Sequence, residues 1–271
     1  MPELPEVETT RRGLEPYVAG RRILSLTVHE RRLRWPVAAD LPHVLAGQRI
    51  ESVGRRAKYL LLNLTHGTLL WHLGMSGSLR VVPVGLPADT HDHIDLVLDS
   101  GQQVRFNDPR RFGSLHYVSG APQNHPLLAR LAPEPFDPAF NPQYLWEITR
   151  RRRAPIKQVL LNSHLVTGVG NIYANEVLFQ AGVRPRRQAR GLSLAKVERI
   201  VEAVREVLSK AIRAGGTTLR DYIDPEGRPG YFKQELFVYE RTDQPCRVCG
   251  TPIRQFTQGQ RSTWYCPRCQ R

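Results

Sequence analysis

The chain has 271 residues, 41% of them hydrophobic, which is enough for two domains that each bury a sizeable core. Its 39 Lys and Arg residues outnumber its 25 Asp and Glu residues, and the formal net charge of +14, spread over several segments, favours nucleic acid over an anionic lipid surface. No apolar run approaches the roughly 20 residues of a membrane-spanning helix, and the acidic start lacks the basic and apolar regions of a secretion signal, so we expect a cytoplasmic protein.

The start of the sequence carries a candidate nucleophile. Removal of Met1 would leave the secondary amine of Pro2 at the terminus, with the carboxyl group of Glu3 beside it. An α-amino group titrates near ~8, well below lysine, so part of it is neutral at cellular pH. Secondary amines attack sugar aldehydes to give iminium ions, which is lyase chemistry. Many sequences begin with Met-Pro without such a role, so a catalytic role for Pro2 needs support from other motifs in the chain.

The next hundred residues predict a short helix and then a β domain. Pro5 can open the helix, and Val7 and Leu14 lie on one of its faces. From about residue 22 to residue 118 the pattern is strand-like, with alternation over 24–28 and 94–98. Continuous apolar runs cover 59–62 and 68–71, and glycines punctuate the region at positions 54, 67, 74, 77 and 101. Short strands at this spacing predict a β-sandwich or barrel.

A helical region follows a proline-rich stretch. Residues 122–142 contain six prolines and are predicted to link two domains. Residues 155–162 and 172–181 are predicted to form two helices around Gly168-Val169-Gly170-Asn171. The glycines would let the backbone approach a ligand, and Asn171 stands where an N-cap would direct amides at an anion; a plain turn between helices is the alternative.

A long amphipathic helix is predicted next. Apolar residues at three-and-four spacing run from Leu194 to Ile212, with Ser193 as the N-cap. Gly215 and Gly216 form the stop. This helix is expected to pack into the core of the second domain.

All four cysteines lie in the last 26 residues, as Cys246-x-x-Cys249 and Cys266-x-x-Cys269 separated by sixteen residues. Two such turns can share one tetrahedral ion, which predicts a single Zn²⁺; two disulfides, the alternative, suit a secreted protein. Four protein ligands leave no open position, so the zinc is expected to be structural. Residues 253–265 predict two short strands around a Gln-Gly-Gln turn, and Arg261 beside this turn is placed to reach phosphates.

Taken in order, these segments resemble the bacterial formamidopyrimidine-DNA glycosylases, base-excision repair enzymes for oxidised purines. The resemblance runs nearly end to end and rests on the cysteine ribbon together with the motifs at 2–9, 56–60, 72–77, 91–93, 108–113 and 168–174. It implies an α+β multidomain fold with an N-terminal β-sandwich, a C-terminal helical domain with a helix-two-turn-helix unit over roughly 155–181, and a terminal four-cysteine zinc ribbon. The implied boundaries are 1–133, 134–236 and 237–271.

The resemblance also implies the reaction. The enzyme would remove 8-oxoguanine and formamidopyrimidines from double-stranded DNA and cut the abasic site by β,δ-elimination. Pro2 would attack C1′ of the damaged nucleotide and form a Schiff base. Glu3 would act as general acid, Glu6 as a supporting acid and Lys58 as a further proton donor, although sequence alone makes Lys58 a surface charge on a strand.

DNA-binding roles are carried over in the same way. A damaged base is buried in the stack, so the nucleotide has to be extruded and the space filled. The family's wedge maps onto Met75, Arg110 and Phe112, with Arg110 facing the orphaned base, whereas sequence alone would place Met75 and Phe112 in the core. The family's phosphate contacts map onto His72, His91, Arg152, Asn171 and Arg261, and Arg261 also takes part in the second elimination.

Three further segments complete the expectations. The lesion-reading loop is expected near residues 220–232. Glu240 stands where many relatives carry glycine, and an acid near DNA would lower local affinity. His91-Asp92-His93 is not assigned a metal, because two His two residues apart lack a further convergent ligand. We also expect the protein to be a monomer that is associated with the nucleoid of a bacterium.

Two alternatives remain open. The first is the endonuclease VIII branch, which removes oxidised pyrimidines with the same amine; Leu4 and Val7-Glu8-Thr9 favour the purine-directed branch. The second is a zinc-ribbon DNA-binding protein without catalysis. It accounts for the charge and the cysteines but not for Pro2-Glu3 together with Lys58.

Overall fold

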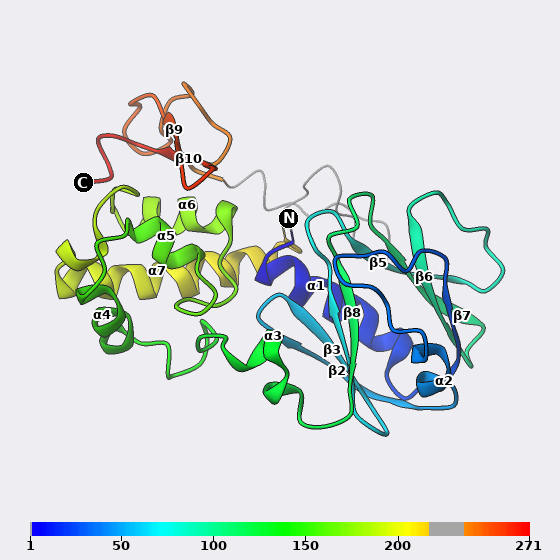
Figure 1. Cartoon of the computed structure of the whole chain (residues 1–271). Coiled ribbons are helices and arrows are strands. Elements are labelled where there is room, and N and C mark those ends of the chain that lie inside the picture. Colours follow the sequence, from blue (N-terminus) through cyan, green and yellow to red (C-terminus); the bar gives the residue numbers. More distant parts are fainter. Residues whose placement is uncertain (1, 217–235) are drawn as a thin grey trace. The chain divides into compact units, whose positions relative to one another are not determined.

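The computed structural model describes residues 2–216 and 236–271 (Figure 1). The predicted lesion-reading loop at 220–232 lies outside the described residues. The chain divides into two compact units, the first comprising Met1–Ala129 and Ile212–Lys233 and the second Arg130–Ala211 and Gln234–Arg271. None of the described helices combines the length and apolar character that crossing a bilayer requires.

The first unit contains two four-stranded antiparallel sheets. One has the order β1-β6-β7-β5 and is formed by β1 (Ile23–Val28), β6 (Asp92–Leu98), β7 (Gln102–Asn107) and β5 (Ser78–Pro83). The other has the order β2-β3-β4-β8 and is formed by β2 (Ile50–Arg56), β3 (Tyr59–Leu64), β4 (Thr68–His72) and β8 (Ser114–Val118). Buried residues of both sheets share one core, in which the rings of Trp71 and Phe106 meet edge to face at 5.5 Å. The predicted β-sandwich is confirmed.

Helix α1 (Leu4–Val18) packs against this core. It begins one residue before Pro5, and Val7 and Leu14 are fully buried on one face, as predicted. Proline is accepted in a first helical turn because the N–H it lacks would have no intrahelical partner there. Proline also stands in the first two residues of three helical turns that were not predicted, which are α2 (Leu41–Leu45), a 3₁₀ turn (Pro122–Asn124) and α3 (Pro126–Ala129).

Strand β1 departs from the predicted alternation. Its register against β6 shifts between Ile23 and Ser25, which marks a β-bulge. As a result Ile23 and Leu26 are buried, whereas Leu24 is 55% exposed. The alternation over 94–98 holds in β6, where Ile94, Leu96 and Leu98 are all fully buried in the core that the two sheets share.

The second unit combines helices with a terminal hairpin. Its helices are α4 (Pro142–Arg150), α5 (Ile156–Leu161), α6 (Asn171–Gln180), most of α7 (Leu194–Arg213) and a 3₁₀ turn (Ala189–Gly191). The predicted helices are confirmed, and the Ser193 hydroxyl accepts the Lys196 N–H at 3.4 Å just ahead of α7. Helix α4 was not predicted; it begins after Asn141, whose side chain caps it by accepting the Tyr144 N–H at 2.9 Å. Strands β9 (Arg254–Gln258) and β10 (Arg261–Tyr265) form the predicted hairpin.

Candidate active site and metal centre

Two buried carboxyl groups lie at the start of α1, next to Pro2. Pro2 is itself buried, Glu3 is the N-cap at 1% exposure and Glu6 is fully buried. The Glu6 carboxylate accepts the Glu3 backbone N–H at 2.9 Å, and the Glu3 side chain accepts the Glu6 N–H, so the two form a capping box. Gly216, at φ +80°, closes over Glu6, because a Cβ there would lie 3.1 Å from Glu6 Oε1. The helix start therefore holds two fixed carboxyl groups beside the predicted nucleophile.

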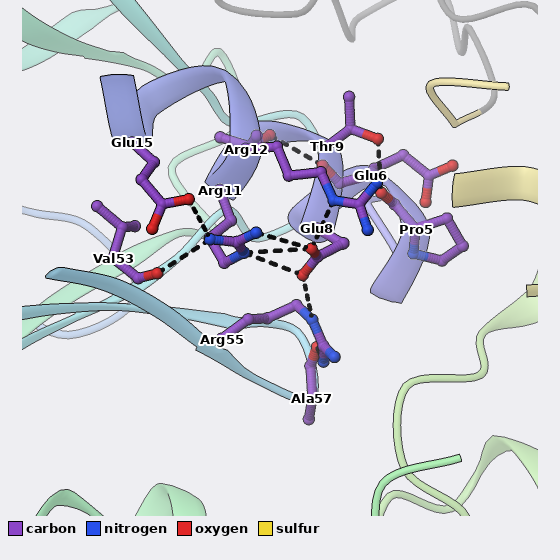
Figure 2. Close-up of polar contacts among 11 residues, drawn as sticks. Pro5, Glu6, Glu8, Thr9, Arg11, Arg12, Glu15, Val53, Arg55 and Ala57 are labelled. Atoms are coloured by element: carbon purple, nitrogen blue, oxygen red, sulfur yellow. Dashed lines mark hydrogen bonds and ion pairs between the residues drawn. The ribbon is translucent and has the colours of Figure 1, made fainter. Parts of the chain in front are cut away.

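A cluster of three arginines surrounds the next acid of α1 (Figure 2). The Glu8 carboxylate accepts hydrogen bonds from Arg11, Arg12 and Arg55, with shortest distances of 3.1, 2.8 and 3.1 Å. Burial alone would raise the pKa of Glu8, but the hydrogen bonds and charges of these guanidinium groups hold it below its usual value. Glu8 is thus an ionised hub that ties α1 to strand β2.

This hub reaches the turn that carries Lys58. Arg55 Nη1 donates to the carbonyl oxygen of Ala57 at 2.9 Å, and Ala57 has a φ of +54°, in the region that favours glycine (Figure 2). Lys58 follows directly, in the two-residue connection between β2 and β3. The expectation of a strand lysine was therefore wrong: Lys58 stands on a tight turn. The sequence did not reveal the pairing of Glu8 with Arg55, because it joins residues 47 positions apart.

His72, the last residue of β4, is held as a neutral ring. Its Nδ1 accepts the Gly74 N–H at 2.9 Å, so the ring proton is on Nε2. Burial, followed by the nearby charges of Lys58 and Arg34, lowers the pKa of His72 to about 4. At neutral pH His72 can therefore donate a hydrogen bond through Nε2 but carries no charge.

This lowered pKa predicts how stability depends on pH. In the unfolded chain His72 takes up a proton near ~6.5, whereas in the folded protein its pKa is about 4. Between these values the unfolded state binds more protons, so the free energy of unfolding should fall as the pH decreases from ~6.5 towards 4. Above ~6.5 this contribution is constant. Urea denaturation at pH 7.5 and pH 5 should show a smaller decrease for His72→Gln than for the wild type; equal decreases would contradict the assignment.

The residues predicted as a wedge lie on the surface of the first unit. Met75 is 36% exposed and Phe112 is 42% exposed, so neither is a core residue. Arg110 is exposed, and its guanidinium carbon lies 4.9 Å from the centre of the Phe112 ring. Arg110 and Phe112 thus form an exposed stacked pair, and Met75 is a further large apolar side chain at the surface.

The His91-Asp92-His93 segment separates into one exposed and two buried residues. His91 is exposed, whereas Asp92 and His93 are buried. His93 Nε2 lies 2.8 Å from the carbonyl oxygen of Asp108, and Asp92 pairs with Arg80 at 3.1 Å. His91 therefore remains accessible to a ligand, and its two neighbours serve the fold.

Predicted phosphate contacts of the second unit lie on α6, on the hairpin and after α4. Gly170 is the N-cap of α6, so the placement of Asn171 as the cap was wrong; Asn171 is the first helical residue. Its Nδ2 donates to the carbonyl oxygen of Ser262 at 3.1 Å, which links α6 to β10. Arg152, just after α4, donates to the carbonyl oxygen of Ile148, and Arg261 is exposed at the start of β10.

The four cysteines converge in the second unit. Their sulfur atoms all lie within 4.8 Å of one another, with Cys246 to Cys269 at 3.9 Å and Cys249 to Cys266 at 3.5 Å. Disulfides need about 2.05 Å, whereas a tetrahedral ion with bonds of about 2.3 Å places its sulfurs about 3.8 Å apart. Among the described residues this is the one group of three or more His, Cys, Asp or Glu that could hold a metal. The site fits one structural zinc.

Comparisons with known proteins cover the whole chain. Three family models match it: the formamidopyrimidine-DNA glycosylase N-terminal domain over 1–115, the formamidopyrimidine-DNA glycosylase H2TH domain over 131–222, and the zinc finger found in FPG and IleRS over 243–271. Formamidopyrimidine-DNA glycosylases of Methylococcus capsulatus and Thioalkalivibrio sulfidiphilus are 55% and 57% identical to the chain, with 100% of both chains covered.

Solved structures agree. The MutM (Fpg) protein from Thermus thermophilus has a TM-score of 0.90 at 41% identity, covering 99% of this chain and 98% of its own. Lactococcus lactis Fpg in complex with DNA containing an abasic site has a TM-score of 0.92 at 33% identity, covering 100% of both chains. With the sandwich, the helical unit and the four-cysteine centre in place, the chain belongs to the formamidopyrimidine-DNA glycosylase family of DNA repair enzymes.

Proposed function

We propose that this base-excision repair glycosylase removes oxidised purines through the amine of Pro2, exposed by removal of Met1. The observation that carries the proposal is the start of α1, where Pro2 precedes the buried capping box of Glu3 and Glu6. Lys58, on the β2–β3 turn that Arg55 and Glu8 tie to α1, supplies a further polar group. Relatives of this chain are described in complex with DNA that contains an abasic site or Fapy-dG, which supports damaged duplex DNA as the substrate.

The proposed chemistry follows from these groups. The neutral Pro2 nitrogen attacks C1′, a new C–N bond forms, and the bond from C1′ to the damaged base breaks. Glu3 donates a proton that assists base departure or sugar opening, and Lys58 is a further donor; positioned proton transfer contributes about 10²–10⁴-fold. The Pro2 nitrogen then loses its proton, and protonation of the ring oxygen lets the bond between C1′ and that oxygen break, which opens the sugar and leaves an iminium ion between C1′ and the nitrogen. The iminium ion withdraws electrons from the C2′–H bond, so loss of that proton expels the 3′ phosphate. A second elimination, assisted by Arg261, expels the 5′ phosphate.

DNA binding is proposed to use both units. In the first unit His72 and His91 contact phosphates, His72 as a neutral donor, while Met75, Arg110 and Phe112 fill the space of the extruded nucleotide. In the second unit Arg152, Asn171 and Arg261 contact phosphates, and the zinc holds the ribbon that carries Arg261.

Organisation and location are proposals as well. The division into three domains, 1–133, 134–236 and 237–271, follows the three segments that the family models match. In the structure, the zinc ribbon and the helical domain belong to the same compact unit. We infer a monomer that acts on the chromosome in the cytoplasm of a bacterium, since the relatives are bacterial repair enzymes.

Borohydride trapping tests the proposed amine. Borohydride reduces an iminium ion to a stable amine, so protein that starts at Pro2, verified by mass spectrometry, should form a covalent adduct with a duplex containing 8-oxoguanine. A preparation that retains Met1 should form none, because its proline nitrogen is an amide. Adduct formed equally well with Met1 present would refute Pro2 as the nucleophile.

The same assay separates the alternatives. Stronger trapping on a thymine glycol duplex than on an 8-oxoguanine duplex would support the endonuclease VIII-like specificity. Absence of any adduct with protein that starts at Pro2, although it binds the damaged duplex, would support a non-catalytic zinc-ribbon binder.

A further inference from the structure

Two loops of the first unit join the same two pairs of strands. Residues 73–77 connect β4 to β5, and residues 108–113 connect β7 to β8. Strand β4 pairs with β8 in one sheet and β5 pairs with β7 in the other, so both loops cross between the sheets. Pairing reaches the residues that flank the loops, His72 opposite Ser114 and Ser78 opposite Asn107. The loops are therefore held side by side at both ends.

A buried carboxylate joins these loops to each other. Asp108 has no exposed surface, and its Oδ1 accepts a hydrogen bond from the Ser76 hydroxyl at 2.6 Å. Its Oδ2 accepts the Gly113 backbone N–H at 2.8 Å, so the same side chain also ties the start of its own loop to the end. The Ser76 oxygen in turn accepts the Arg110 backbone N–H at 3.3 Å. Hydrogen bonds to an ionised acceptor are about twice as strong as neutral ones.

The loop backbones also touch. Gly74 has a φ of +68°, and a Cβ atom there would lie 2.4 Å from backbone atoms of Phe112 and Gly113. Because there is no room for even a Cβ atom between the two loop backbones at this point, one loop cannot slide past the other without separating from it. Backbone contact and the Asp108 carboxylate therefore act together to fix the relative position of the loops.

Three exposed side chains extend from the joined loops, namely Met75, Arg110 and Phe112. We propose that Asp108 and Ser76 are positioning residues that make these three side chains one preformed wedge. This inference rests on the proposed function, in which the wedge replaces the extruded nucleotide. A wedge that is already ordered loses less conformational entropy on entering the base stack, so extrusion of the damaged nucleotide is favoured.

Ser76→Ala is the sharper test because it removes one hydroxyl and keeps the Asp108 charge. We expect single-turnover excision of 8-oxoguanine from duplex DNA to slow about tenfold, since a buried charge-assisted hydrogen bond is lost. Strand cleavage at an abasic site in single-stranded DNA should stay within about twofold of the wild type, because no base has to be extruded there. Asp108→Asn should likewise slow excision from the duplex and spare cleavage of the single strand, and its effect on the duplex should be larger.

Ser114→Ala is the matched control. Ser114 is 1% exposed at the start of β8, and its hydroxyl has no hydrogen-bond partner within the part of the chain that the structure describes. The substitution therefore deletes the same atom from a similarly buried serine and leaves the hydrogen bonds of Ser76 and Asp108 in place. Duplex excision by this variant should equal that of the wild type.

A comparison with a variant that lacks the wedge separates positioning from general destabilisation. In a Met75→Ala/Arg110→Ala/Phe112→Ala background all three wedge side chains are already removed, so adding Ser76→Ala should cause no further loss. Equal losses on duplex and single-stranded substrates, a further loss in that background, or wild-type duplex excision by Ser76→Ala would overturn the inference. The wild-type borohydride adduct is measured in parallel, so its absence would instead count against the proposed function.

Discussion

Substitution of Glu3 by glutamine is expected to abolish base excision and to leave DNA binding intact. Glu3 is 1% exposed and occupies the N-cap of α1 directly after Pro2. Glutamine has nearly the same shape and keeps an oxygen that can accept the Glu6 N–H, so the start of α1 should be preserved. It has no carboxylic proton to donate, so single-turnover excision should fall at least about 100-fold.

Glu15→Gln is the control on the same helix. The Glu15 side chain is 44% exposed and pairs with the half-buried Arg11 at 2.7 Å, one helical turn away, and the loss of such an i,i+4 pair should cost about 0.3–0.5 kcal/mol. This variant should excise 8-oxoguanine at the wild-type rate. Binding is measured by fluorescence anisotropy on a duplex with a non-cleavable abasic analogue, and excision by gel under single-turnover conditions. Wild-type excision by Glu3→Gln would place the general acid elsewhere.

Features that depend on nearby residues could be predicted from the sequence. The periodicity from Leu194 to Ile212 coincides with α7, because a 3.6-residue repeat of apolar residues is itself the requirement for burying one helix face. The paired Cys-x-x-Cys spacing predicted the metal centre for a similar reason, since each pair fits one tight turn.

Features set by distant contacts could not be predicted in this way. The alternation that includes Leu24 is interrupted by a bulge against β6, and Lys58 was assigned to a strand because a left-handed Ala57 has no local signal. The contacts of Asp108 with Ser76 and of Glu8 with Arg55 join positions 32 and 47 residues apart. Such hydrogen bonds depend on strand pairing, which residue periodicity does not specify.

Glu240 shows a departure that the structure explains in part. Its φ of +56° lies in the left-handed region, where glycine is favoured over residues with a Cβ atom. The glycine expected in many relatives at this position therefore suits the backbone. Glu240 is exposed, so this chain accepts a strained backbone at the surface.

Substitution of Cys249 by alanine is expected to release the zinc and to weaken DNA binding. Three remaining thiolates cannot complete the closed tetrahedral site, and zinc binding in small fingers provides about 10–16 kcal/mol of apparent folding free energy. Two of the zinc ligands are also part of the ribbon's buried cluster, in which Cys246 and Cys266 pack with Ile253 and Trp264. Loss of the metal should therefore disorder the β9–β10 hairpin.

The damage should extend to α5 and α6. Phe179 of α6 belongs to the same buried cluster as Trp264, and Lys157 of α5 donates to the carbonyl oxygen of Ser262 at 3.0 Å. Asn171 donates to the same oxygen at 3.1 Å. Because the hairpin positions these side chains, its loss removes the proposed contact by Arg261 and also loosens the one made by Asn171.

Two contacts to phosphate, each contributing about 1.5–3 kcal/mol, imply that affinity for damaged duplex falls at least about 100-fold. Zinc content is measured with a colorimetric chelator and affinity by fluorescence anisotropy. Val248→Ala is the control, because Val248 is 67% exposed between the first two cysteines and its truncation leaves all four thiolates in place. Wild-type affinity in a zinc-free Cys249→Ala protein would show that the hairpin is held by its own packing, because the metal would then contribute nothing to the position of Arg261 or Asn171.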